Sequence, residues 1–350
     1  MGIILNLILF VLVLGVIVFV HELGHFLFAK KTGVYVYEFA IGMGPKLFGV
    51  KRGETVYSIR AIPIGGFCQM AGEDVDSDEE IKIPKGRSLQ DKTIFQKFLI
   101  MFFGAGFNFI FAILILFVSA LIWGAPGLDP IVTGVEKDSP ASKIGIDVGD
   151  TIIKINGNDI ANIDEVAIEL GISDPKKGSL ITIEKESGNV KEYNLKPEKV
   201  EIDDKELYKY GIGLEQEIER GFVTSIKYTF GKTASIFNQM WITVSELFTG
   251  GVKVNQLSGP VGIYSIVGES ASAGLENVIY LVAFLSINVG FLNLLPLPAF
   301  DGGRILFLLI EKVKGSPVKP QTENIIHTAG LFLLMGLMIY VTFQDILRLF

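Results

Sequence analysis

Two histidines and a glutamate near the N-terminus have the spacing of a zinc-binding helix. The residues His21-Glu22-Leu23-Gly24-His25 have the form H-E-x-x-H. On a helix, residues four apart lie on one face, so the two imidazoles can bind a single ion. Glu22 is rotated by about 100° from His21 and can accept a proton from water activated by that ion. The motif therefore predicts metal-assisted hydrolysis, and Gly24 predicts a close approach of another backbone or a substrate.

The motif lies inside an apolar segment. Residues 3–20 are apolar apart from Asn6, and Phe26-Leu27-Phe28-Ala29 follow the motif before Lys30. Ionisable groups at membrane depth each cost roughly 2–3 kcal/mol or more unless they are paired or ligated. A metal site is therefore favoured over a chance match. At about 1.5 Å per residue, the motif lies roughly 7–13 Å from Lys30, nearer the cytoplasmic face of the membrane.

A catalytic zinc site needs a third protein ligand. The chain has three histidines, and His327 begins an apolar stretch, where we expect a packed or interfacial residue. Asp301 is the better candidate because Pro296 and Pro298 break the preceding helix, and a broken helix beside a carboxylate is how membrane proteins build polar sites. The alternative is that Asp301 and the two glycines after it only cap the end of a span.

Composition and hydropathy indicate a polytopic membrane protein. The chain has 350 residues, of which 49% are hydrophobic, and its mean hydropathy is +0.47. The net charge of −7 argues against nucleic acid as a partner, and the single cysteine, Cys68, excludes an internal disulfide. The first apolar run has no basic start and no cleavage site, which favours an uncleaved helix. Four stretches can cross a bilayer: 3–29, 98–124, 277–300 and 324–344.

The loops carry their lysines and arginines unevenly. The segments 32–96 and 304–323 have basic residues near the spans, so we expect them in the cytoplasm and 125–276 outside. Strand patterns at 34–39 and 55–60 predict a hairpin that dips toward the membrane. The acidic run 73–80 is expected to be a solvated loop.

The outer segment changes character along its length. Residues 127–200 read as a small β-rich domain and 201–221 as a polar linker. Residues 222–249 mix aromatic and charged side chains, which favours an amphipathic helix on the membrane surface. The short apolar stretch 304–310 predicts buried packing or an interfacial turn.

Several motifs, in order along the chain, resemble the site-2 protease family of intramembrane zinc metalloproteases, in its bacterial regulator of sigma-E protease branch. The resemblance covers nearly the whole chain, and the motifs that carry it are 21–25, 44–47, 60–67, 104–108, 258–263 and 293–303.

The resemblance implies a role for each site residue. It implies that His21, His25 and Asp301 bind Zn²⁺ and that Glu22 is the general base. It also implies that Asn108 and Asn293 hold substrate or the oxyanion, which suits a neutral amide donor in a dry site. One departure is Ala105, which stands where the family often has a proline.

The resemblance also implies one extracytoplasmic PDZ domain, carried by 139–141, 149–153 and 155–157. Ile144 departs from the usual alanine. The family domain excludes substrates with bulky outer domains, an interpretation that we favour over a peptide receptor. The family hairpin pairs with an unwound substrate segment.

The predicted protein is a four-span membrane endopeptidase with a cytoplasmic-side β-hairpin and one PDZ domain, in a bacterial inner membrane. We expect substrates with a single span, namely anti-sigma factors and signal-peptide remnants. The predicted segments are 1–31 (first span), 32–96 (hairpin), 97–124 (second span), 125–200 (PDZ domain), 201–276 (linker and interfacial helix), 277–303 (third span), 304–323 (loop) and 324–350 (fourth span).

Three alternatives remain open from the sequence: a membrane-anchored zincin with its site in solvent, a PDZ scaffold with a structural metal, and a metal transporter. The apolar flanks of the motif argue against the first. Glu22 argues against the second, and the lack of repeated polar spans argues against the third.

Overall fold

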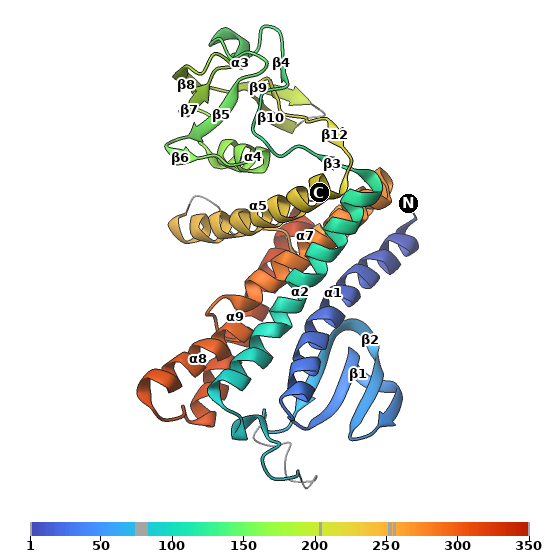
Figure 1. Cartoon of the computed structure of the whole chain (residues 1–350). Coiled ribbons are helices and arrows are strands. Elements are labelled where there is room, and N and C mark those ends of the chain that lie inside the picture. Colours follow the sequence, from blue (N-terminus) through green and yellow to red (C-terminus); the bar gives the residue numbers. More distant parts are fainter. Residues whose placement is uncertain (1, 74–82, 203–204, 251–253, 255–256, 349–350) are drawn as a thin grey trace. The chain divides into compact units, whose positions relative to one another are not determined.

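The computed structural model describes residues 2–73, 83–202, 205–250, 254 and 257–348 (Figure 1). The chain divides into two compact units. One comprises Met1–Leu116 with Val254–Phe350, and the other comprises Phe117–Lys253. The predicted acidic loop at 73–80 lies, apart from Glu73, outside the described residues.

The first unit is a helical bundle with a small sheet. Four helices of the described residues are long and apolar enough to cross a membrane, which confirms a polytopic membrane protein. Two shorter helices and the 3-10 turn Leu89–Asp91 accompany them among the described residues. The bundle consists of α1 (Ile3–Lys31), α2 (Ile94–Trp123, up to residue 116), α6 (Pro260–Ala273), α7 (Leu275–Leu294), α8 (Asp301–Lys314) and α9 (Pro320–Leu347).

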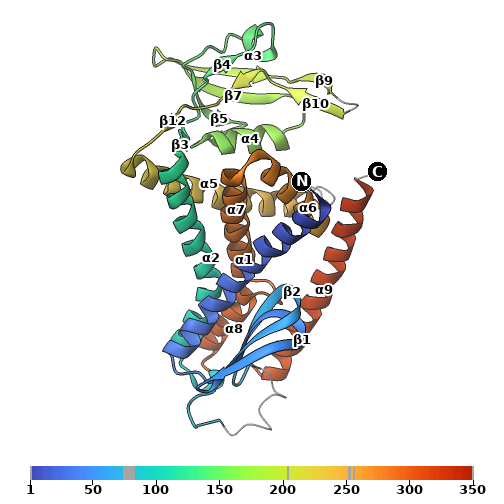
Figure 2. The same ribbon diagram turned by 90° about the vertical axis from the view of Figure 1, so that its right-hand side faces the viewer.

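The sheet of this unit lies alongside the C-terminal half of α1 (Figures 1 and 2). It is built from β1 (Val36–Arg52) and β2 (Thr55–Met70), which are much longer than the predicted strands. Both strands bend back on themselves, so Phe39 lies opposite both Cys68 and Tyr57. The segment 66–70 pairs on one side with 36–41, and among the described residues it forms an edge of the sheet.

Apolar packing fixes the sheet against the bundle. One buried cluster joins the end of α1, the sheet and the start of α2. Its members are Ala29, Val34, Val36, Phe39, Cys68, Met70, Leu89, Ile100 and Met101. The C-terminal end of the motif helix is therefore held by tertiary contacts.

The third span and the loop after it differ from the prediction. The predicted span reached Phe300, whereas α7 ends at Leu294 and Leu295 has an extended backbone (ψ 140°). Pro296 explains the early end, because a proline disfavours the helical conformation of the residue before it and cannot donate a helical hydrogen bond. The expected turn at 304–310 belongs to α8, which begins at Asp301.

The second unit contains a four-stranded sheet with the strand order β6-β5-β7-β8. Its apolar core includes Ile152, Ile155, Ile181 and Ile183, all fully buried. Its elements are β3 (Ala125–Pro126), β4 (Gly134–Val135), α3 (Pro140–Lys143), β5 (Thr151–Ile155), β6 (Asn158–Asp159), α4 (Ile163–Ile172), β7 (Ser179–Glu184), β8 (Val190–Leu195), β9 (Glu198–Ile202), β10 (Lys205–Lys209), β11 (Ile212–Gly213), β12 (Ile218–Glu219) and α5 (Phe222–Thr249).

The segment expected as a polar linker contributes strands to this unit. Within 201–221, β11 pairs with β4 and β12 pairs with β3, so the β-rich region extends past the predicted end at 200. Short strands of alternating charged and apolar residues have the same composition as a polar linker. Only their pairing with other strands distinguishes such strands from a linker.

Helix α5 packs its polar face inside the second unit. Lys232 forms an ion pair with Asp164 at 2.7 Å, and Asn238 donates to Glu165 at 2.7 Å. The opposite stripe of α5 is apolar and exposed; it carries Phe222, Val223, Phe230, Phe237, Trp241 and Phe248.

Candidate metal centre

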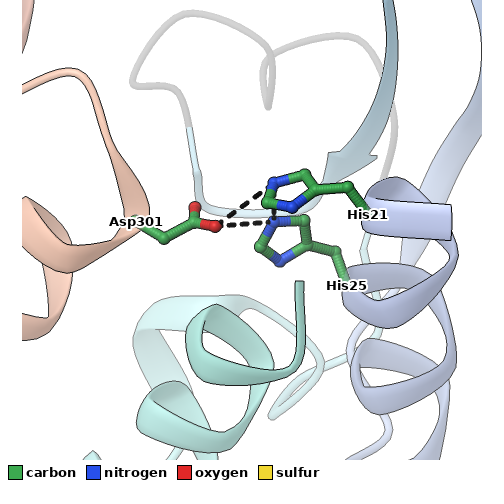
Figure 3. A group of neighbouring side chains, drawn as sticks. All are labelled: His21, His25 and Asp301. Carbon is green, nitrogen blue, oxygen red and sulfur yellow. Dashed lines mark hydrogen bonds and ion pairs between the residues drawn. The ribbon is translucent and has the colours of Figure 1, made fainter. Parts of the chain in front are cut away.

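Three potential ligand atoms from α1 and α8 converge at one point (Figure 3). The Oδ2 atom of Asp301 lies 3.3 Å from Nε2 of His21 and 3.2 Å from Nε2 of His25. The two Nε2 atoms lie 3.2 Å apart. The fold thus brings together two histidines of one helix and a carboxylate some 280 positions later in the chain.

These separations suit a zinc ion. Bonds of about 2.0–2.1 Å in tetrahedral geometry separate ligand atoms by about 3.3–3.4 Å, close to the three distances here. The buried Oδ2 of Asp301 also has no hydrogen-bond donor among the described residues. The donor set, two imidazoles and one carboxylate, matches that of catalytic zinc sites, which leave a position open for water.

The orientation of His25 is fixed by the backbone of α2. Its Nδ1 lies 3.0 Å from the carbonyl oxygen of Ile100, which can only accept a hydrogen bond. Nδ1 must therefore carry the proton, and the lone pair of Nε2 faces the convergence point. Such an outer hydrogen bond is typical of histidines that bind metals.

Two glycines allow α1 and α2 to approach each other at the site. A β-carbon on Gly24 would lie 2.0 Å from the carbonyl oxygen of Phe103, and one on Gly104 would lie 2.3 Å from Nε2 of His25. The close approach at Gly24 was expected from the sequence. The contact of Gly104 was not, because a glycine in an apolar helix has no pattern that reveals what it faces.

Asp301 is placed by a turn and by the start of α8. After α7 ends, the chain turns over 295–300, and Asp301 is the first residue of α8. Gly302 and Gly303, in the first turn of α8, are buried against this loop, where β-carbons would lie 2.2 Å from the Leu295 carbonyl oxygen and 2.4 Å from that of Leu297. The glycines therefore let the turn close tightly behind the carboxylate.

The convergence point opens into a cavity of about 590 Å³. Glu22 and Asn293 line this cavity together with the three convergent residues. Its other lining residues are Arg60, Phe67, Cys68, Gln69, Met70, Glu73, Met101, Ala299, Phe300 and Arg304. Residues 67–70 of the edge segment therefore form one wall of the cavity.

Asn108 is not among the residues that line the cavity. Its side chain is fully buried, and neither its amide nitrogen nor its oxygen has a partner among the described residues. It lies one helical turn after Gly104 and thus on the same face of α2. Asn293 is placed at the cavity, and its Nδ2 donates to the carbonyl oxygen of Val289 at 2.9 Å.

Comparison with known proteins identifies the family. The model of peptidase family M50 matches residues 9–337. The chain belongs to peptidase family M50. This M50 protein is 38% identical over 310 residues to a protein of Clostridium perfringens, covering 88% of this chain and 89% of that one. It is 32% identical to the zinc metalloprotease RasP of Bacillus licheniformis and 31% identical to the regulator of sigma-W protease RasP of Bacillus subtilis, each over 387 residues, 89% of this chain and 91% of the relative.

The M50 protein is therefore a zinc metalloprotease of the site-2 protease family, which acts in regulated intramembrane proteolysis. This confirms the expected family, the enzyme class and the zinc cofactor. The alternatives of a scaffold and of a metal transporter are wrong.

Two ion pairs at the cavity of the M50 protein were not foreseen. Arg304 of α8 pairs with Glu73, which follows β2, and Arg60 pairs with Glu38 at 2.9 Å. Burial raises the pKa of Glu38, but hydrogen bonds from Ser58 and Arg60 outweigh burial and hold this pKa below its usual range. Nothing in the sequence links Arg304 to Glu73, because the two residues are far apart in the chain.

Proposed function

We propose that His21, His25 and Asp301 hold the zinc ion of this peptidase and that Glu22 is its general base. The observation that carries this proposal is the convergence of the three ligand atoms at 3.2–3.3 Å beside Glu22. Zinc, when bound there, supplies Lewis acidity toward water and the scissile carbonyl.

The residues around the proposed zinc site transfer the proton and orient the ligands. Glu22 accepts a proton from the attacking water and later donates it to the leaving amine nitrogen. The hydrogen bond from His25 to the Ile100 carbonyl holds that imidazole in one tautomer. Only 12% of the His21 side chain and 8% of the His25 side chain are exposed, which limits bulk water near the reacting carbonyl.

Asn293 and Asn108 are proposed to bind substrate or the developing oxyanion. Asn293 lines the cavity, and one of its amide hydrogens is used by Val289. The amide of Asn108 is buried without a partner among the described residues, and unpaired buried amides are costly unless a ligand satisfies them. A substrate peptide would provide that partner once the side chains that cover Asn108 move aside.

The substrate is proposed to bind as an added strand along 66–70. This segment is a sheet edge, and its residues 67–70 line the cavity. A β-carbon on Gly66 would lie 3.4 Å from the Glu22 side chain. Main-chain groups of the edge can pair with an extended peptide. A substrate helix must therefore unwind before its peptide bond reaches Glu22.

Single-span membrane proteins are the proposed substrates, with anti-sigma factors and signal-peptide remnants as the expected classes. The name of the Bacillus subtilis relative, regulator of sigma-W protease, supports the first class. We place the enzyme in the bacterial inner membrane, with the zinc site nearer the cytoplasmic face and residues 125–276 outside, because the basic residues of 32–96 and 304–323 flank the spans.

The β-rich region of the second unit is proposed to be a PDZ domain that filters substrates by size. Strand β11 pairs with β4, and the Tyr210 hydroxyl donates to the Leu170 carbonyl of α4 at 3.1 Å. A strand beside a helix is the arrangement that PDZ domains use for peptides. A bulky outer domain added to a cleavable substrate should block its cleavage. Removal of the proposed PDZ domain from the peptidase should restore cleavage of that enlarged substrate.

The test of the catalytic proposal is Glu22→Gln in the purified full-length protein. Zinc content should stay at the wild-type level, while cleavage of a transmembrane peptide should fall by at least about 10²-fold. Cleavage at the wild-type rate would refute the role of Glu22. Labelling of His21 and His25 by a membrane-impermeant reagent would instead favour a zincin with its site in solvent.

A further inference from the structure

His327 holds the loop that carries Asp301. Its Nδ1 accepts a hydrogen bond from the backbone N–H of Ala299 at 3.0 Å. Because an amide N–H can only donate here, Nδ1 must be unprotonated. This contact joins α9 to the loop 295–300, two residues before the carboxylate that faces His21 and His25.

The loop is strained at the residue that His327 contacts. Ala299 has a φ of +74°, in the left-handed region that residues with a β-carbon rarely adopt. Within the loop, the N–H of Leu297 donates to Leu295 and that of Phe300 donates to Leu297. The N–H of Ala299 instead depends on a side chain from another helix, so its conformation is imposed by α9.

The same part of α9 supports the loop sterically. Gly330 lies beneath Pro298, where a β-carbon would lie 2.3 Å from the Pro298 Cβ atom. A β-carbon on Gly303 would lie 3.4 Å from Cε1 of His327, and the ring of Phe307 packs on the imidazole with centroids 5.6 Å apart. The imidazole is thus enclosed by the loop, α8 and α9, with only 15% of its side chain exposed.

We infer that His327 is a positioning residue for zinc binding: through Ala299 it fixes the loop conformation that places Asp301 at the ion. This inference rests on the proposed role of Asp301 as a ligand. It gives a function to a histidine that was expected from its sequence position only to be a packed or interfacial residue. A loop free to relax at Ala299 would move the Asp301 carboxylate away from the two imidazoles.

The experiment compares His327→Leu with His327→Asn in the full-length protein. The two replacements have nearly the same shape, but only asparagine offers an acceptor oxygen at the δ position, where Nδ1 now lies. Zinc affinity is measured by competition with a chelator, ligand geometry by the absorption spectrum of the cobalt-substituted protein, and kcat and KM with a transmembrane peptide.

We expect His327→Leu to weaken zinc binding about tenfold or more and to change the cobalt spectrum. It should lower kcat while KM stays within about twofold, because the substrate edge at 66–70 is untouched. His327→Asn should restore zinc affinity to within about threefold of wild type. Wild-type affinity and spectrum in His327→Leu would overturn the inference, as would equal losses in both variants.

Asp301→Ala separates this inference from the proposal on which it rests. If Asp301→Ala keeps wild-type zinc affinity, the proposed ligand set is wrong. If it loses zinc while His327→Leu does not, only the positioning role is wrong. The double variant should bind zinc no more weakly than Asp301→Ala alone, because the two residues act through one contact with the ion; additive losses would overturn the inference.

Gly330→Ala provides an independent test if His327→Leu does not accumulate. Its β-carbon would push on Pro298 and displace the same loop without touching the imidazole. We expect a loss of zinc affinity of about tenfold here as well. Unchanged affinity in folded Gly330→Ala would show that the loop conformation does not control zinc binding.

Discussion

Gly104 lies directly against the imidazole of His25, with room for a hydrogen but not for a methyl group. A β-carbon there would lie 2.3 Å from Nε2 and 2.4 Å from Cε1 of the ring. A residue of the second span therefore shapes the candidate metal centre without offering a ligand atom. The contact also explains why α2 can supply the Ile100 carbonyl to the same imidazole.

Gly104→Ala should reduce zinc affinity by about tenfold or more, because the imidazole must turn away from the convergence point. Chelator competition on the purified protein measures this loss. The control is Gly106→Ala in the same helix, where a β-carbon would meet only phenylalanine rings at 3.3 Å or beyond. Equal zinc affinity in the two variants would contradict the steric argument.

Asn108→Leu should separate stability from activity. Replacing a buried, unpaired amide by an apolar group of similar shape should leave thermal stability unchanged or higher. If the amide binds the oxyanion, kcat should fall by about 10²-fold.

The matched control is Asn6→Leu. Asn6 is also a buried asparagine of a membrane helix, but it contacts Tyr264 and Gly268, so its replacement should leave kcat unchanged. A kcat of wild-type size in Asn108→Leu would remove Asn108 from the proposed site.

Glu54 should make the stability of the hairpin depend on pH in the acidic range. Bidentate hydrogen bonds from Arg87, aided by Lys30, lower the pKa of Glu54 to about 2. The ionised form is thus favoured by folding, so its stabilising effect is complete above the usual pKa of about 4.3 and is lost as the pH falls toward 2. The difference in Tm between wild type and Glu54→Gln should therefore shrink across this range. A constant difference from about pH 6 to pH 3 would contradict the prediction.

The ion pair between Lys232 and Asp164 should hold α5 against α4. Lys232→Met leaves a largely buried carboxylate whose remaining hydrogen-bond donor among the described residues is Ser235, and should destabilise this contact by about 3 kcal/mol. Faster hydrogen exchange in α4 and α5 would report the loss. Adding Asp164→Leu should restore much of the protection, because the uncompensated charge is then removed. Further loosening in the double variant would contradict this view.

Local patterns in the sequence were enough to predict the four spans and the two histidines. Apolar runs of sufficient length specify membrane helices, and the spacing of His21 and His25 is fixed by helix geometry alone. Asp301 could be proposed because Pro296 and Pro298 mark the break before it. Each of these signals lies within a few residues of the feature that it predicts.

Contacts between distant segments could not be predicted in this way. The Ile100 carbonyl carries no side-chain signal, and the pairing of Arg304 with Glu73 depends on how the loop after β2 meets α8. The bent strands 36–52 and 55–70 read as a simple hairpin, because double pairing of 38–41 is a property of the assembled sheet. The third span ended early because the local effect of Pro296 outweighed apolar composition up to Phe300.

The zinc site proposed between α1 and α8 would also tie zinc supply to assembly of the membrane bundle. An ion held by the proposed ligands from both helices favours the assembled chain by mass action, in proportion to the logarithm of free zinc over its dissociation constant. At about a hundred times that constant the gain is about 2.7 kcal/mol. A cell short of zinc would therefore contain peptidase that is both less active and less stable. Helix α8 would separate from α1 more often, and quality-control proteases would remove the protein more readily.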